Sequence, residues 1–127
     1  MIDIAAIVQF HDSKLAGREW LHAEPEPLGP GLWCWIYANH RYNSLLWHED
    51  QRQRIACYRR RRLHARAAID DALQALLAQP LPPGKAGAMI DRLSLLSLRI
   101  VHLPAQAPRW RRQRARLLAH LARLLAS

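Results

Sequence analysis

The 127-residue chain has no threonine, one phenylalanine, five glycines and few β-branched residues. β-Branched and aromatic residues favour strands, whereas the abundant alanine, leucine and arginine favour helices. Long apolar runs are also missing, because none approaches the roughly 18 residues that a membrane-spanning helix needs. We therefore expect an all-α protein with no membrane span.

Cysteine is scarce as well. The two cysteines, Cys34 and Cys57, lack the paired spacing of a zinc site, and we expect both to be free thiols. On one helix His40 and His48 would lie two turns apart, roughly 12 Å by helix rise, which is too far for one metal ion. We predict no metal site and no cofactor.

Acidic residues are outnumbered by basic ones, 10 against 19, and 17 of the basic residues are arginines, giving a formal net charge of +9. Such an excess suggests nucleic acid, an acidic protein or an anionic membrane surface as a partner.

The N-terminal stretch contains Asp3 and lacks the basic segment and cleavage site of a signal peptide. We therefore expect a cytoplasmic protein of bacterial type.

The length fits one helical domain over residues 1–127, able to bury roughly two-thirds of its unfolded surface. Apolar residues recur at steps of three and four in segments separated by proline- and glycine-rich loops. The predicted helices cover residues 2–22, 32–79, 86–103 and 109–125, and the loops cover residues 24–31, 79–84 and 104–108.

Residues 32–79 contain no proline or glycine. One helix of that length would extend about 70 Å, whereas a compact domain of this size has a radius of gyration of about 14 Å. We therefore expect it to break near residues 51–55, or to bend and project. The predicted fold is an all-α bundle of four or five helices with one long, bent or broken second helix. We expect this helix to pack antiparallel to the 86–103 helix at the centre.

Two patterns along these helices concern packing. His11 lies on the apolar stripe of the first helix, which favours a hydrogen-bonded core histidine over a ligand. After residue 54, mainly apolar residues recur at spacings that alternate between three and four positions, which is typical of the seam of a coiled-coil-like helix. The seam contains Ile55, Tyr58, Arg62, Ala65, Ile69, Ala72 and Leu76.

The stretch Asn43-Ser44-Leu45-Leu46-Trp47-His48-Glu49-Asp50 combines apolar, amide and carboxylate side chains. On a helix Asn43, Leu46, Trp47 and Asp50 share one face. If Trp47 points inward, its polar neighbours follow, and a buried carboxylate costs several kcal/mol unless it is paired. This face therefore needs polar partners elsewhere in the chain.

The partners that we expect come from Met89-Ile90-Asp91-Arg92-Leu93-Ser94-Leu95-Leu96-Ser97-Leu98-Arg99-Ile100. We predict a buried ion pair that joins Asp50 or Glu49 to Arg92 or Arg99. We also expect Asn43 to hydrogen-bond Asp91 or Ser94.

The first stretch resembles an N-x-x-L-W signature followed by an E-D pair, and the second resembles an M-I-D-R-L-S-x-L motif. Together they resemble the bacterial helical family called domain of unknown function 4254, over most of the chain. Residues 51–55 leave almost no room for that family's acidic insertion, and residues 65–69 replace a polar motif. The resemblance implies no known activity. It implies a setting beside cell-envelope glycosyltransferases.

Two interpretations of the motif residues remain open. In the first they form a buried network that fixes how the helices align. In the second they surround a cleft for a polar ligand, with the carboxylates as acid, base or, less favoured, metal ligands. The candidate polar cluster contains Asn43, Trp47, Glu49, Asp50, Asp91, Arg92 and Arg99.

A separate candidate is the arginine run of Arg59, Arg60, Arg61 and Arg62, with Arg66 nearby. These arginines form either a solvated helix surface or a site for phosphates, which would be independent of base sequence and strongly dependent on salt. No aromatic residue interrupts the run, so nucleic acid is possible but not favoured.

Leucine on the 55–77 and 109–125 helices exceeds what we expect one small chain to bury, which predicts an exposed patch and a homodimer. The leucines and the isoleucine concerned are Ile69, Leu73, Leu76, Leu77, Leu117, Leu118, Leu121, Leu124 and Leu125.

The favoured function is a non-enzymatic interaction or accessory protein. The alternatives are a polar-ligand-binding domain or enzyme centred on the two motifs, and a non-specific binder of anionic polymers.

Overall fold

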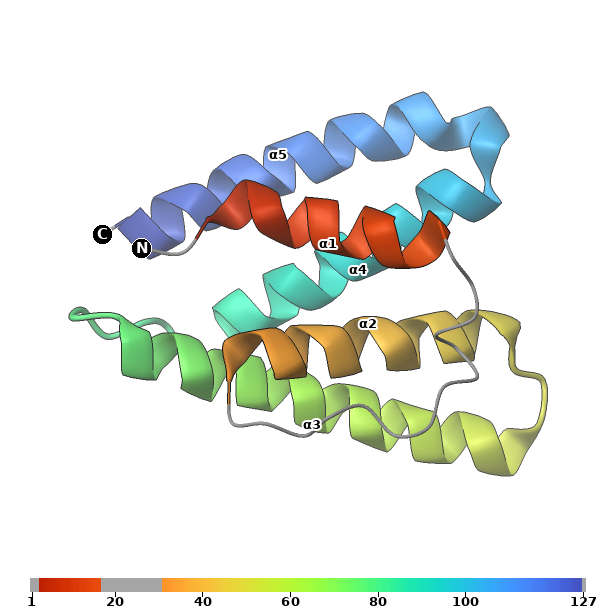
Figure 1. Cartoon of the computed structure of the whole chain (residues 1–127), viewed down its shortest axis with the longest axis horizontal. Coiled ribbons are helices and arrows are strands. Elements are labelled where there is room, and N and C mark those ends of the chain that lie inside the picture. The colour runs from red at the N-terminus through yellow and green to blue at the C-terminus, as the bar shows by residue number, and fades with distance from the viewer. Residues whose placement is uncertain (1–2, 17–30, 127) are drawn as a thin grey trace.

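The computed structural model describes residues 3–16 and 31–126 (Figure 1). These residues form α1 (Ile4–Ala16), α2 (Leu32–His48), α3 (Arg52–Leu76), α4 (Lys85–His102), the 3-10 helix η2 (Pro104–Gln106) and α5 (Ala107–Ala126). The predicted all-α bundle is confirmed. The expected continuation of the first helix over residues 17–22 and the loop at residues 24–30 lie outside the described residues.

The long second stretch is broken at residues 49–51, close to the predicted position. Glu49 has an extended backbone, with ψ of 136°, and its carboxylate accepts the backbone N–H groups of Asp50 at 3.2 Å and Gln51 at 3.1 Å. Gln51 is also extended, and α3 starts after it. The break lets α2 and α3 fold back on each other as a hairpin (Figure 1).

Two successive reversals, between α2 and α3 and between α3 and α4, make α2 and α4 run in the same direction (Figure 1). The residue numbers of contacting pairs increase together along the two helices: Asn39 contacts Asp91, and further along Trp47 contacts His102. The predicted antiparallel packing of the second helix on α4 is therefore wrong for α2 and right for α3. The break is the reason, because it reverses the chain within the segment treated as one helix.

The core lies around α4, which contacts α1, α2, α3 and α5. Each helix contributes side chains that are removed from solvent, as the apolar periodicities predict. They include Ile7, Ile36, Ile69, Leu73, Ile90, Leu93 and Leu121. None of the described helices has both the length and the apolar character needed to cross a membrane.

Several of the leucines from which we predicted an exposed patch lie inside this single-chain core. Leu73 and Leu121 are fully buried, and Leu117, Leu118, Leu124 and Leu125 pack against the core while partly exposed. Leu76 is the exception, with 62% of its surface exposed. Some of this leucine therefore remains exposed, as expected, but less of it than the sequence suggested, because all five α-helices share the core.

The closest approach of α3 and α4 depends on Gly87. A Cβ atom at this position would lie 2.4 Å from the Arg66 carbonyl oxygen of α3. The Gly87 N–H donates to the Asp70 carboxylate at 2.9 Å, which ties the start of α4 to α3. One turn further along α4 and one turn back along α3, Asp91 faces Arg62. The missing side chain at Gly87 thus brings the helices close enough for this pair.

Candidate functional site

The Asp91 carboxylate is the centre of a buried polar network. Its Oδ1 accepts hydrogen bonds from the side-chain amides of Asn39 at 2.8 Å and Asn43 at 2.9 Å, and from Arg62 Nε at 3.0 Å. Its Oδ2 accepts from Arg62 Nη2 at 2.6 Å and lies 3.8 Å from Arg66 Nη1. Only 3% of the Asp91 side chain is exposed. Both carboxylate oxygens are therefore engaged by the protein itself.

Charge and hydrogen bonding keep Asp91 ionised. Burial alone would raise the pKa of Asp91, but the hydrogen bonds from Arg62, Asn39 and Asn43, together with the charge of Arg62, bring this pKa below its usual 3.8. The same pairing raises the pKa of Arg62. A carboxylate with a lowered pKa and two occupied oxygens is a poor general base.

The network continues through Ser94 to His40, and its hydrogen bonds have a defined direction. His40 Nε2 lies 3.0 Å from the His11 carbonyl oxygen, which can only accept, so Nε2 carries the proton. His40 Nδ1 is then the acceptor, and the Ser94 hydroxyl donates to it at 2.6 Å. Ser94 in turn accepts from Asn43 at 3.1 Å. The neutral form of His40 is therefore matched to its surroundings.

The His11 and His40 rings contact each other with centroids 4.4 Å apart and a tilt of 35° between their planes, and both are fully buried. Neither ring nitrogen of His11 has a hydrogen-bond partner among the described residues. Burial lowers the pKa of His40 to about 4, against a smaller opposing effect of its hydrogen bond to His11. Burial, His40 and Arg114 lower the pKa of His11. His11 is therefore a core histidine, as predicted, but without the predicted side-chain hydrogen bond in the described structure.

A second polar link joins α5 to the same core. Arg114 Nη1 donates to Asp12 of α1 at 2.9 Å and to Ser97 of α4 at 3.0 Å. With the contacts of Asp91 and Ser94, this gives α4 direct polar links to α2, α3 and α5, while α1 joins the network through His40 and Arg114. Because each link requires a particular alignment of two helices, the network fixes how the bundle fits together.

Two of the predicted site residues meet as expected. Asn43 hydrogen-bonds both Asp91 and Ser94, so that prediction is confirmed. The predicted ion pair of Asp50 or Glu49 with Arg92 or Arg99 is wrong. Among the described residues, the cationic partner of Glu49 is Arg54, at 3.9 Å.

The other residues of that predicted pair lie apart. Asp50 and Arg92 are exposed, because the chain leaves the helix before Asp50 and Arg92 points away from the core. The Arg99 guanidinium stacks on Trp110, 4.9 Å from the ring centroid. Trp47 is 37% exposed and stacks on His102 with centroids 5.2 Å apart.

The side chains of the arginine run point in two directions. Arg59, Arg60 and Arg61 are exposed, whereas Arg62 and Arg66 turn toward Asp91. The sequence had a signal for this, because Arg62 occupies a position of the predicted apolar seam. Asn39 and His40 were missed as site residues, although Asn39 and Asn43 are four residues apart and so share a helix face.

No group of three or more histidine, cysteine, aspartate or glutamate side chains in residues 3–16 and 31–126 could hold a metal ion. Cavities formed by described residues elsewhere are lined by other side chains. One of about 340 Å³ lies between α4 and α5, and one of about 980 Å³ lies at the end of the bundle where α1 begins and α5 ends.

Comparison with protein-family models, curated proteins and solved structures gives no match to this chain. The resemblance to domain of unknown function 4254 therefore stays a prediction, carried by the two motifs. In this structure, the residues of the two motifs that contact each other, Asn43 with Asp91 and Ser94, belong to the buried polar network.

Proposed function

We propose that this protein is a non-enzymatic interaction or accessory protein, whose polar motifs hold the bundle together and whose exposed basic surface contacts an acidic protein. The closure of the Asp91 network carries the proposal. With both oxygens engaged and 3% of the side chain exposed, Asp91 has no position left for a substrate. The chemistry available to a partner is then that of the surface.

The outer face of α3 supports a basic contact surface. Arg52, Arg59 and Leu63 lie within one side of the helix by their spacing, with Arg60 adjacent, and all four are exposed. None of the three arginines forms an ion pair with a described residue. These charges therefore remain available to an outside anion.

Helix stability does not explain this arrangement. The first turn of α3 contains Arg52 and Arg54 and no acidic residue, whereas the positive end of the helix dipole favours acidic side chains. Arg54 pairs with Glu49 at 3.9 Å, whereas Arg52 forms no ion pair with a described residue and costs about 0.3–1 kcal/mol at low ionic strength, which an anionic partner would reverse. Leu63, 53% exposed among the arginines, favours a protein partner, since an apolar side chain gains little from phosphate groups.

The test uses two defined acidic polymers, poly-L-glutamate and a glutamate–tyrosine copolymer, with binding followed by fluorescence anisotropy. The proposal predicts tighter binding of the copolymer, loss of binding in Arg59→Glu/Arg60→Glu, and loss of the copolymer preference in Leu63→Ser. The matched control is Arg111→Glu/Arg112→Glu, which reverses two exposed arginines on α5 and should retain binding.

Equal loss in both charge-reversal variants would show diffuse electrostatics and contradict a defined α3 surface. Tighter binding to duplex DNA, collapsing between about 50 and 200 mM salt, would favour the anionic-polymer alternative. A thermal shift with a nucleotide or nucleotide sugar, lost in Asn43→Ala, would favour the polar-ligand alternative.

Self-association is the second part of the proposal, and we assign it to the end of the bundle. Trp33 and Leu76 are exposed there, beside the cavity of about 980 Å³ that Ile4, Leu32 and Leu125 also line. Light scattering should give twice the 14.7 kDa chain mass, and Leu76→Glu should return the monomer. A wild-type monomer at every concentration would refute this part. The resemblance adds cell-envelope glycan synthesis as the proposed process.

A further inference from the structure

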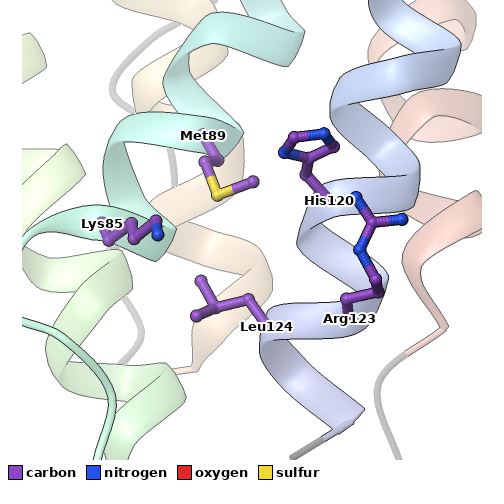
Figure 2. A pocket seen from close by; sticks show the side chains of 5 residues that line it. All are labelled: Lys85, Met89, His120, Arg123 and Leu124. Atoms are coloured by element: carbon purple, nitrogen blue, oxygen red, sulfur yellow. The ribbon is translucent and has the colours of Figure 1, made fainter.

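A small basic pocket lies between the first turns of α4 and the last turns of α5 (Figure 2). It has a volume of about 340 Å³ and is lined by Lys85, Met89, His120, Arg123 and Leu124. Figure 2 shows Met89 of α4 opposite His120 and Leu124 of α5, with the side chains directed into the gap between the helices. None of these residues belongs to the Asp91 network.

The spacing of these residues explains why they meet. Lys85 and Met89 are four residues apart on α4, and His120, Arg123 and Leu124 occupy positions i, i+3 and i+4 on α5, so each set shares one helix face. Because α4 and α5 run in opposite directions, the start of one lies beside the end of the other (Figure 1).

The pocket combines cationic groups at its rim with an apolar floor. Lys85 and Arg123 are charged at neutral pH, and His120 adds ring nitrogens, while Met89 and Leu124 are partly buried. No carboxylate lines the pocket, and no described residue forms an ion pair with Lys85 or Arg123. Asp70, near the start of α4, accepts the Gly87 N–H and forms no ion pair with Lys85. The charges of the rim are therefore not neutralised by these neighbours.

We propose that this pocket binds a small organic phosphate, with the phosphate between Lys85, His120 and Arg123 and an apolar group against Met89 and Leu124. Lysine and arginine form strong charge-assisted hydrogen bonds with phosphate oxygens, and donors arriving from two helices suit a tetrahedral anion. The volume is at the lower end of small-molecule sites, which limits the ligand to a small one. This inference does not depend on the proposed acidic protein partner.

The test is calorimetric titration of the full chain with phenyl phosphate, inorganic phosphate and phenol. We expect phenyl phosphate to bind most tightly, inorganic phosphate more weakly, and phenol not at all at the same millimolar concentrations. Lys85→Gln/Arg123→Gln should weaken phenyl phosphate binding about tenfold or more for each cation removed. Arg112→Gln/Arg116→Gln removes two exposed charges of α5 outside the pocket and should bind as the wild type does.

Circular dichroism melting of the Lys85→Gln/Arg123→Gln variant checks that it folds, which is expected because both side chains are exposed. Absence of phenyl phosphate binding by the wild type, or unchanged binding by this variant, would overturn the proposal. Vesicles containing phosphatidic acid test whether the pocket binds the phosphate of a lipid headgroup. Vesicle binding that requires Lys85 and Arg123, without binding of soluble phenyl phosphate, would also overturn it.

Discussion

Acidification should destabilise this protein at a pH well above the range in which its carboxylates titrate, because His40 is buried in its neutral form. The pKa of His40 is about 4 in the folded protein against 6.5 for an ordinary histidine. Between these values the unfolded chain binds a proton that the folded protein does not, so stability falls as pH falls. Over the full window the loss is about 3 kcal/mol, and about 2 kcal/mol of it occurs between about pH 7.5 and about pH 5.

Urea titrations at these two pH values measure the loss as a change in the free energy of unfolding. His11 adds to the loss in the same direction, because its pKa is also lowered. The ion pair of Asp91 should persist in this window, since the pKa of Asp91 lies below 3.8 and its stabilisation is lost only as pH falls through that lower value.

The decisive comparison is between two histidine variants. His40→Gln retains a donor toward the His11 carbonyl but cannot titrate, so its loss on acidification should be about 2 kcal/mol smaller than that of the wild type. His120→Gln, at an exposed position on α5, should lose as much stability on acidification as the wild type does. A wild type equally stable at both pH values, or a His40→Gln variant with an unchanged loss, would refute the burial argument.

Other predictions concern the helix contacts. Gly87→Ala should destabilise by about 1–3 kcal/mol in urea titrations, because its Cβ would meet the Arg66 carbonyl at 2.4 Å; an unchanged or higher stability would show that α3 can move away. Glu49→Ala should cost about 1 kcal/mol through the loss of two backbone hydrogen bonds at the α2–α3 break. Asp50→Ala should change stability by less than about 0.5 kcal/mol, since Asp50 is exposed, and a loss comparable to that of a buried ion pair would contradict this position.

Helix positions could be predicted from the sequence because prolines, glycines and apolar periodicity are local signals. The direction of α2 relative to α4 could not, since it depends on whether the chain reverses or only bends near residue 50. No proline or glycine marks that reversal. It is stabilised instead by the Glu49 side chain accepting the backbone N–H groups of Asp50 and Gln51.

The site was predictable in part for a related reason. The cost of burying a polar group correctly indicated that Asn43 would meet Asp91, but the same argument was applied to Glu49 and Asp50, which lie beyond the end of α2. The cation that pairs with a buried carboxylate is instead Arg62, whose side chain is 25% exposed. Its place in an apolar seam marked it as inward-facing, yet its position within a run of four arginines suggested a solvated surface.

Asp91 acts as a structural residue whose charge is matched within the protein by Arg62. A double-mutant cycle measures this directly, from the free energies of unfolding of Asp91→Ala, Arg62→Ala and the double variant in urea at neutral pH. We predict that Asp91→Ala loses about 3–5 kcal/mol and that the double variant loses at least about 1 kcal/mol less than the two single variants together. A loss below about 1 kcal/mol for Asp91→Ala, or strictly additive losses, would contradict a buried structural pair.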